Sequence, residues 1–373
     1  MDSAAQVLAV NDDLPIRTGA PVHSGKVRAV YWLTEADSRR LAERRGYPVL
    51  PGAALGIMVI SDRLSAFDCL WRAEGGWDGV PGKGAALNAI AAHWFRRFAA
   101  EGLAPAHLLE APHPLLWVVQ RARPLAIEAI ARQYITGSLW RAYARGERRF
   151  CGIDLPEGLG EHSRLPELLM TPSTKGVLRG IPGVPEADDV NVSREQLLAH
   201  SASFGFARPA DVDHYSTLLA AGFRLIEREL AALDLVFVDT KFEFGYVRCP
   251  GGSDTPDGGE QLIYLDEVGT PDSSRIWDGA AHRAGKVVEF SKEAFRQALL
   301  AGAPDPQVLL DKDRMDARRA LAGDWVLPRA LFEQVSASYR DLAERLTGQP
   351  LRVPERPREE LTGVLADELG LVD

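Results

Sequence analysis

The 373-residue sequence contains only three cysteines, and they lie far apart. Cys69, Cys151 and Cys249 form no Cys-x-x-Cys pair, so the sequence predicts neither a disulfide framework nor a structural zinc site. Few and unpaired cysteines are typical of proteins in a reducing compartment. We therefore expect a cytoplasmic location.

The sequence also lacks a long apolar run. Its longest uncharged stretch, residues 47–61, contains two glycines and two prolines. Residues 1–17 lack the basic start and the apolar core of a signal peptide, so we expect neither a signal peptide nor a membrane span. The formal net charge of -9 does not favour nonspecific binding to nucleic acid. A local basic pocket for a small anion stays open, so small molecules are the expected partners.

What the sequence does contain is the composition of an ordinary globular protein, with 46% hydrophobic and 25% charged residues. At 373 residues the chain exceeds the usual size of a single core, so we expect two lobes. We place their boundary near residue 123, which gives an N-terminal lobe at 1–123 and a C-terminal lobe at 124–373.

Two neighbouring segments, 237–245 and 262–277, predict a pair of strands joined by a Gly/Pro/Asp-rich connector at 250–260. Residues two apart in a strand share a face, so one face of the first strand is charged and the other apolar. The charged face is predicted to carry Asp239, Lys241 and Glu243. The core face is predicted to carry Val236, Val238, Thr240, Phe242 and Phe244. Buried carboxylates are costly alone, so the charged face must meet solvent, counter-charges, a metal or a ligand.

The second segment adds more acids and hydroxyls. Asp266 and Glu267 end its strand, and a turn with Asp272, two serines and Arg275 follows. Acids clustered around one lysine and one arginine suit divalent cations that bridge a polyphosphate. The alternative is an exposed hairpin with salt bridges, which does not explain the Thr-Pro-Asp-Ser-Ser-Arg turn.

Three loop segments precede this pair of strands. Gly25-Lys-Val-Arg28 predicts a glycine turn entering a strand, which would either cover phosphates or form an exposed edge. Residues 61–68 form a loop after a predicted buried strand, where functional sites concentrate. Residues 81–84, Pro-Gly-Lys-Gly, lead into a helix with an apolar face. The polar residues of the 61–68 loop include Arg63, Ser65 and Asp68.

A phosphate site is predicted near the start of another helix. Thr136, Gly137 and Ser138 predict an N-terminal cap for a helix that runs to Gly146, and Arg132 lies shortly before it. Free backbone N–H groups and a guanidinium together favour a phosphate. The alternative, that Ser138 only caps the helix, stays open.

The remaining segments predict one long loop and several helices. Residues 152–192, which include Thr171-Pro-Ser-Thr-Lys175, predict a loop that could close over a site. A short apolar stripe, Leu361, Leu365 and Leu369, is suited to docking on the body of the protein or on a partner subunit, which leaves a homo-oligomer open. Apolar spacing predicts further helices at 214–234 and 331–346. We also expect a surface helix at 34–45 and a helix at 291–300 that Ser291 caps.

Seven segments between about residues 24 and 277 form a recognisable series. They are Gly25-Lys-Val-Arg28, Ser61-Asp-Arg-Leu-Ser-Ala-Phe-Asp68, Pro81-Gly-Lys-Gly84, Tyr134-Ile-Thr-Gly-Ser-Leu-Trp140, Thr171-Pro-Ser-Thr-Lys175, Asp239-Thr-Lys-Phe-Glu-Phe-Gly245 and Asp266-Glu-Val-Gly-Thr-Pro-Asp-Ser-Ser-Arg275. In this order they resemble the SAICAR synthetase family, the phosphoribosylaminoimidazole-succinocarboxamide synthases, and Glu344-Arg-Leu-Thr-Gly348 resembles the family's C-terminal end.

The resemblance implies an ATP-dependent ligase of purine biosynthesis that uses Mg2+. This enzyme joins L-aspartate to the carboxylate of 5-amino-1-(5-phosphoribosyl)imidazole-4-carboxylate through an acyl phosphate. The implied fold is α/β (α+β), with two lobes, antiparallel sheets and flanking helices, related to protein kinases and ATP-grasp enzymes. Nucleotide would lie between the lobes, beside the glycine loop of the first lobe, and the metal and ribonucleotide would lie on the second.

The resemblance also implies roles for individual residues. The residues expected at ATP are Gly25, Lys26, Arg28 and Lys83. The residues expected at the ribonucleotide or at aspartate are Arg63, Ser65, Asp68, Arg132, Ser138 and Lys175. The residues expected to hold Mg2+ are Glu243 and Asp266. The residues expected beside the reacting groups are Lys241, Asp272 and Arg275.

Some positions depart from the family pattern. They are Ala29, Gln133, Gly269, the 186–193 loop and an extra stretch at 34–54. Two other functions are weighed against the ligase: another ATP-dependent carboxylate-amine ligase or kinase on the same scaffold, and a non-catalytic nucleotide-binding regulator. Retention of the acids and cations around the predicted metal site argues against a loss of turnover.

Overall fold

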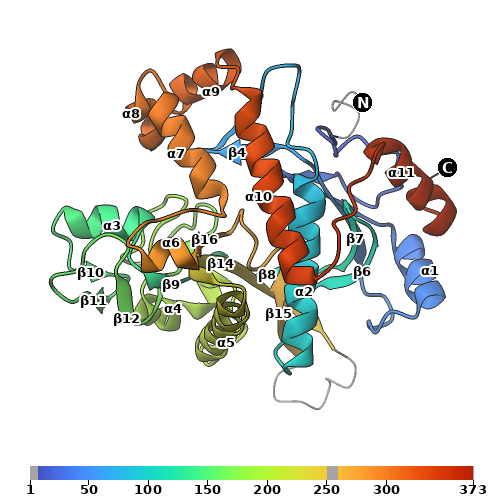
Figure 1. The fold of residues 1–373 in the computed structure, drawn as a ribbon. Helices are drawn as coiled ribbons and strands as arrows, with labels where there is room; N and C mark the ends of the chain where they lie inside the picture. The colour runs from blue at the N-terminus through green and yellow to red at the C-terminus, as the bar shows by residue number, and fades with distance from the viewer. Residues whose placement is uncertain (1–6, 250–258, 373) are drawn as a thin grey trace.

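The computed structural model describes residues 7–249 and 259–372 (Figure 1). Within them, one antiparallel sheet has five strands in the order β1-β2-β3-β7-β6. It lies entirely within the first 120 residues. Its strands are β1 (His23–Ser24), β2 (Arg28–Trp32), β3 (Leu55–Ile60), β7 (Leu116–Gln120) and β6 (Leu108–His113).

A second antiparallel sheet is built around β14 (Leu235–Arg248), the longest strand of the described chain. Because β14 has 14 residues, four other strands pair with different parts of it. The other strands of this sheet are β8 (Arg123–Pro124), β9 (Ile127–Tyr134), β12 (Arg164–Met170), β13 (Ser173–Thr174), β15 (Glu260–Leu265) and β16 (Ser274–Asp278). Two small hairpins complete the strands: β4 (Leu64–Ala66) with β5 (Cys69–Trp71), and β10 (Arg149–Phe150) with β11 (Ile153–Asp154).

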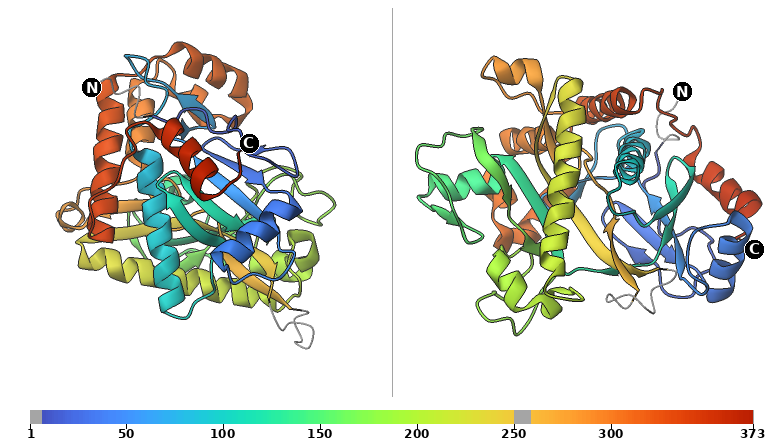
Figure 2. Two further views of the ribbon diagram at one scale, coloured as in Figure 1. Left: turned by 90° about the vertical axis from the view of Figure 1, so that its right-hand side faces the viewer. Right: turned by 90° about the horizontal axis from the view of Figure 1, so that it is seen from below.

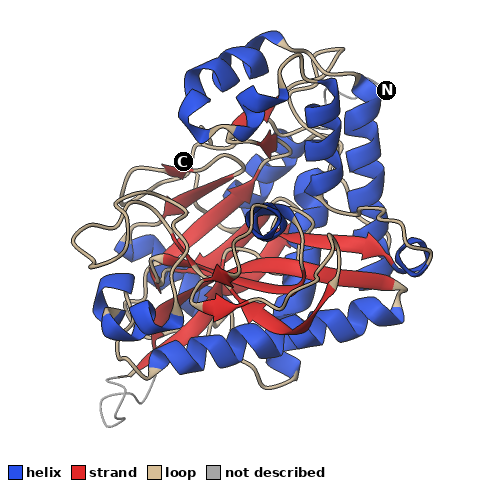
Figure 3. Cartoon of the chain, turned by 90° about the vertical axis from the view of Figure 1, so that its left-hand side faces the viewer, coloured by secondary structure: helices blue, strands red, loops and turns tan. Residues whose placement is uncertain are grey.

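Helices cover both sheets, and one continuous apolar core joins them. Helix α5 (Asp211–Ala232) runs along the second sheet (Figure 3), and α2 (Lys83–Ala100) and α10 (Arg329–Thr347) lie side by side (Figure 2). None of the helices in the described part of the chain is long and apolar enough to cross a membrane. The other helices are α1 (Glu35–Arg45), α3 (Gly137–Ala144), α4 (Arg194–Ala199), α6 (Gly279–Arg283), α7 (Lys292–Gly302), α8 (Pro306–Leu310), α9 (Met315–Asp324) and α11 (Pro357–Gly363).

The predicted helices are confirmed. Helix α1 begins after its Thr34 cap, and α7 begins after its Ser291 cap. Helix α5 (Asp211–Ala232) begins and ends a few residues earlier than predicted, and α10 (Arg329–Thr347) extends slightly beyond its predicted range at both ends. The predicted pair of strands is also confirmed, since β14 and β15 are antiparallel neighbours. Of their predicted connector at 250–260, residues 250–258 lie outside the described residues.

The predicted core face of β14 is wrong at its start. A bulge at Val238 interrupts the pairing of β14 with β16, because Phe237 faces Ile276 and Asp239 faces Arg275. The alternation therefore shifts by one residue. Phe237 joins Phe242 in the main core, whereas Val236 and Val238 pack with Trp277 in a separate cluster.

Two further expectations need correction. The predicted loop at 152–192 contains β12 and β13, both paired with β9, so its backbone is anchored in the second sheet over part of its length. The alternative of an exposed edge for the strand after Gly25 is wrong, because β2 pairs with β1 on one side and β3 on the other.

The apolar stripe of the tail docks on the body of the same chain. Leu361, Leu365 and Leu369 are all 0% exposed and belong to the main core. The extra stretch at 34–54 helps to hold this end, because Arg44 Nη2 of α1 donates to the carbonyl oxygens of Glu368 and Leu369, each at 2.8 Å. Helices α1 and α11 lie together in Figure 1.

This docking predicts a large stability cost for truncating the stripe. Leu361→Ala should lower the free energy of unfolding by about 2–5 kcal/mol, because it leaves a cavity in the core. The exposed control Asp367→Ala should change it by less than about 0.5 kcal/mol. Urea unfolding measures both, and equal effects would contradict the docking.

Candidate active site

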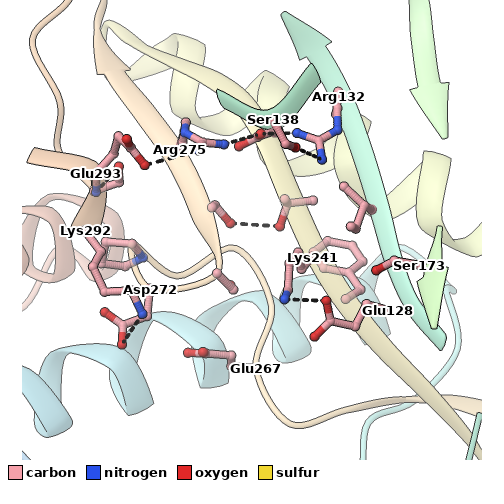
Figure 4. Close-up of a pocket in the computed structure, with 18 of the residues that line it drawn as sticks. Glu128, Arg132, Ser138, Ser173, Lys241, Glu267, Asp272, Arg275, Lys292 and Glu293 are labelled. Carbon is pink, nitrogen blue, oxygen red and sulfur yellow. Dashed lines mark hydrogen bonds and ion pairs between the residues drawn. The ribbon is translucent and has the colours of Figure 1, made fainter. Parts of the chain in front are cut away.

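The charged face of β14 lies at the centre of a cleft (Figure 4). Beyond the bulge, Asp239, Lys241 and Glu243 project from one side of the strand, as the alternation predicts. Neighbouring strands supply their partners: Lys241 Nζ pairs with Glu128 of β9, and Asp239 pairs with Arg275 of β16. Pairing with neighbours offsets the cost of withdrawing these charges from water.

Two adjoining pockets share this wall. The β16 pocket, of about 630 Å³, lies over β9, β14 and β16 and between α3 and α7. The β2 pocket, of about 880 Å³, lies over β2, the 65–68 loop and β15. The residues that line both pockets are Glu128, Asp189, Lys241, Glu243, Asp266, Glu267, Asp272, Lys292 and Arg296. Ligands in the two pockets would therefore contact one set of charged side chains.

Two arginines in the β16 pocket share one carboxylate oxygen. Oδ2 of Asp239 accepts from Arg132 Nη1 at 3.1 Å and from Arg275 Nη1 at 2.6 Å. Arg132 also donates to Thr171 Oγ1 at 2.9 Å and to Ser138 Oγ at 3.4 Å. Burial lowers the pKa of Arg132, although Asp239 acts in the opposite direction. The two guanidiniums are thus held in fixed positions beside the start of α3.

The start of α3 approaches Arg275 closely. Thr136 is its N-cap residue and Ser138 lies in the first turn, so the alternative that Ser138 caps the helix is wrong. Gly137 has a φ of +57°, and a Cβ there would lie 2.6 Å from Arg275 Nη2. A side chain at this position would force the arginine away, so the contact requires glycine.

Asp272 has three donors around its carboxylate. Tyr339 and Lys83 donate to it at 2.7 and 2.9 Å, and Lys292 Nζ lies 3.3 Å from it. Burial alone would raise the pKa of Asp272, but the charges of Lys292 and Lys83 and the bond from Tyr339 outweigh it and lower the pKa well below its usual range. The surrounding cations therefore favour the ionised form of Asp272.

The glycine turn and the 61–68 loop line the β2 pocket. Lys26 pairs with Asp68, and Arg28 Nη2 donates to Glu267 Oε2 at 2.9 Å. Arg28 Nε also lies 3.5 Å from Asp266 Oδ1. The apolar lining of this pocket includes Val30, Trp32, Met58 and Leu265. A ligand with both an apolar and an anionic part fits this combination.

Of the predicted metal ligands, Glu243 lies within β14 opposite Leu265, and Asp266 directly follows Leu265 at the end of β15; both face both pockets. Burial and the nearby charge of Asp266 raise the pKa of Glu243, although its ion pair with Lys175 acts in the opposite direction. Among the described residues, no group of three or more His, Cys, Asp or Glu side chains could hold a metal by itself. Two carboxylates fit Mg2+, which is commonly bound by one or two carboxylates together with substrate phosphates.

Two predicted site residues lie outside the lining of both pockets. Lys83 is 0% exposed and bonds to Asp272, so it is not placed to meet phosphates directly. Arg63 donates to the carbonyl oxygen of Gly25 at 3.2 Å and to Asn11 Oδ1 at 3.0 Å. Arg63 therefore stabilises the glycine turn and does not line either pocket. The other predicted site residues line one or both pockets.

Four further residues that line the pockets are not among the predicted site residues: Glu128, Arg141, Lys292 and Arg296. Lys292 and Arg296 are four residues apart, so they lie on one face of α7, and their spacing after the Ser291 cap is a signal that the sequence contains. Arg141 follows Ser138 by three residues, which places both on one face of α3. No comparable local signal identifies Glu128.

Two adjoining pockets on an α+β scaffold share one wall of acids and cations. This arrangement fits a class of enzyme that brings a nucleotide and a second anionic substrate together. Comparison with known proteins narrows this class. The family model of SAICAR synthetase matches residues 21–305. Relatives of the same family match the chain over its whole length. The chain therefore belongs to the SAICAR synthetase family.

The relatives named phosphoribosylaminoimidazole-succinocarboxamide synthase include proteins from Vibrio cholerae and Shewanella baltica. The first is 62% identical over 373 residues and the second 60% over 372, each covering 100% of both chains. The predicted activity is therefore that of this family: ATP-dependent joining of L-aspartate to the ribonucleotide carboxylate in purine biosynthesis.

Solved structures share the fold. A SAICAR synthase from Saccharomyces cerevisiae, complexed with SAICAR, has a TM-score of 0.62 at 24% identity and covers 88% of this chain and 95% of its own. A SAICAR synthetase (Type-2) in complex with ADP has a TM-score of 0.54 at 18% identity, with 89% and 99% covered. The predicted fold class is confirmed.

Lys292 predicts a pH dependence of binding. Burial lowers its pKa from 10.5 to about 8, although Asp272 acts in the opposite direction. Because a lysine loses its charge as the pH rises through its pKa, affinity for the anionic ribonucleotide should fall several-fold between about pH 7 and 9.5. Lys292→Arg should retain its charge and remove most of this decline. Calorimetric titration across this range is the measurement, and the same decline in both proteins would exclude Lys292 as its cause.

Proposed function

We propose that ATP binds in the β2 pocket and the ribonucleotide in the β16 pocket, so that a phosphoryl group passes between them at the shared wall. The observation that carries this proposal is the wall itself, whose charged residues line both pockets. A nucleophile and a phosphoryl donor bound on either side of one wall are already close, which removes much of the entropic cost of bringing them together.

The lining of the β2 pocket supports ATP. Trp32 and Met58 offer apolar surface to a base, and Lys26 and Arg28 offer charge to phosphates. ADP is present in one solved SAICAR synthetase. Gly25 and Lys26 would approach the phosphates directly, whereas Arg28 would act together with the acids that it pairs with.

We infer that Glu243 and Asp266 would hold Mg2+ together with ATP. The ion would offset negative charge on the phosphates and so favour attack by another anion. In the protein described here Lys175 balances the charge of Glu243. The charges of Lys175 and the two carboxylates therefore act together. Lys175 is also a candidate contact for aspartate, because the carboxylates of aspartate require cations.

The β16 pocket supports the ribonucleotide phosphate. Arg132 and Arg275 share Asp239, so part of their charge is already neutralised. Arg141 lies on the same face of α3 as Ser138, and no carboxylate of the described residues forms an ion pair with it. We therefore add Arg141 and Arg275 to the predicted phosphate site of Arg132 and Ser138.

The proposed reaction has two steps. A carboxylate oxygen of the ribonucleotide attacks the γ-phosphorus of ATP, the bond to the β-phosphate oxygen breaks, and ADP leaves. The amine of aspartate then attacks the acyl carbon, inorganic phosphate leaves and the amine proton is released. Lys241 lies at the shared wall, where its ammonium can stabilise the developing negative charge of either step.

We propose two lobes, 1–123 and 124–373, with this cleft between the two sheets. Helix α10, from the end of the chain, packs against α2 of the first lobe, so the proposed second lobe also contacts the first through this helix pair. A cytoplasmic location and a homo-oligomer stay predictions, and the role in purine biosynthesis supports the first.

The test of the proposed function is the substrate dependence of ADP release. ADP should accumulate at the full rate only when ATP, the ribonucleotide and L-aspartate are all present. Release with a single acceptor would identify a kinase, and no release under any condition would identify a regulator. A coupled ADP assay with each substrate omitted in turn distinguishes these outcomes.

The metal assignment predicts a strong effect of amide substitution. Glu243→Gln and Asp266→Asn keep the shape but remove a charge that Mg2+ prefers, so kcat should fall by about two orders of magnitude or more, with rescue by excess Mg2+ incomplete. The melting temperature should change little. Turnover and Mg2+ dependence at the wild-type level in both variants would exclude these residues as ligands.

The phosphate site predicts a selective effect of Arg141. Arg141→Ala should raise the KM for the ribonucleotide roughly tenfold, because one charge-assisted bond is lost, while the KM for ATP stays unchanged. Arg145→Ala is the matched control, since Arg145 is also exposed near the end of α3 and pairs with Glu147. Steady-state kinetics would remove Arg141 from the site if both variants behaved alike.

A further inference from the structure

The carboxylate of Asp272 is held by side chains from three helices that are far apart in the sequence. Tyr339 Oη of α10 donates to Oδ1 at 2.7 Å, and Lys83 Nζ of α2 donates to Oδ2 at 2.9 Å. Lys292 Nζ of α7 lies 3.3 Å from the same Oδ2. Each carboxylate oxygen therefore has a buried donor, and rotation of the side chain would break at least one of these bonds.

Helix α10 contacts both sides of this arrangement. Ser336 Oγ donates to the carbonyl oxygen of Pro81 at 2.6 Å, within the turn that carries Lys83. Ser336 and Tyr339 are three residues apart, so they lie on one face of the helix. This helix begins at residue 329, beyond the 21–305 range matched by the family model.

We propose that Tyr339 is a positioning residue for the ligase reaction: it fixes the carboxylate of Asp272, and through it the ammonium of Lys292, at the wall shared by the two pockets. The proposal rests on the proposed function, because it requires that this wall faces the transferred phosphoryl group. Tyr339 is 1% exposed and reaches the cleft through Asp272.

The chemistry of Tyr339 agrees with a holding role. Burial and the charge of Asp272 raise the pKa of Tyr339 well above its usual range. Its hydroxyl therefore stays protonated and remains a donor to the carboxylate. Asp272, with its strongly lowered pKa, is a poor proton acceptor, so its part at the wall is to hold a negative charge in a fixed position.

The test compares Tyr339→Phe with Tyr246→Phe. Tyr246 Oη donates to Asp211 Oδ2 at 2.7 Å, so it forms the same buried tyrosine–aspartate bond away from both pockets. The two variants should lose a similar amount in melting temperature. Only Tyr339→Phe should lower kcat, roughly tenfold, while the KM for ATP stays within about twofold of wild type. Equal kcat values for the two variants would overturn the proposal.

A double-mutant cycle supplies the second readout. In an Asp272→Asn background, Tyr339→Phe should lower kcat by no more than about twofold further, because the group that it positions is already changed. A full tenfold loss in that background would overturn the proposal. The comparison with Tyr246→Phe decides the question alone if Asp272→Asn does not fold. Failure of the proposed function is distinct, since it would appear in the wild-type protein as ADP release at the full rate without aspartate.

Discussion

The pairing of buried charges is the constraint on which the rest of this structure depends. Asp239 and Asp272 are both withdrawn from water, and each would be costly without partners. Each collects cations from elements that are far apart in the sequence: Asp239 from β9 and β16, and Asp272 from α2 and α7. Asp239 thus joins three strands of the second sheet, and Asp272 joins the turn before β16 to α2, α7 and α10.

This constraint explains why the last part of the chain returns to the cleft. Helix α10 brings Tyr339 to Asp272, and α9 brings Arg318, which donates to the carbonyl oxygen of Phe67 at 3.1 Å. Phe67 has a φ of +52°, a conformation that needs support from its surroundings. Side chains from the C-terminal segment therefore support loops of both pockets. Because the site is already ordered before substrates bind, less of the binding energy is lost in ordering it.

The sequence predicted the charged face of β14, because a period of two is visible wherever one side of a strand is apolar. It could not reveal the bulge at Val238, since one extra residue leaves every residue type in place and only shifts the phase. The family resemblance implied that Lys83 contacts ATP, but its ion-pair partner, Asp272, lies 189 positions away in the sequence. Local motifs indicate backbone conformation well and distant ion pairs poorly, so the sequence predicts the helix that carries Tyr339 but not its bond to Asp272.

The central claim is that a phosphoryl group moves from ATP to the ribonucleotide carboxylate across the shared wall. The most direct measurement is isotope tracing with 18O in that carboxylate, because an acyl phosphate transfers one carboxylate oxygen to the released phosphate. The account predicts inorganic phosphate that carries one labelled oxygen per turnover. Unlabelled phosphate, formed at the same rate as SAICAR, would contradict it.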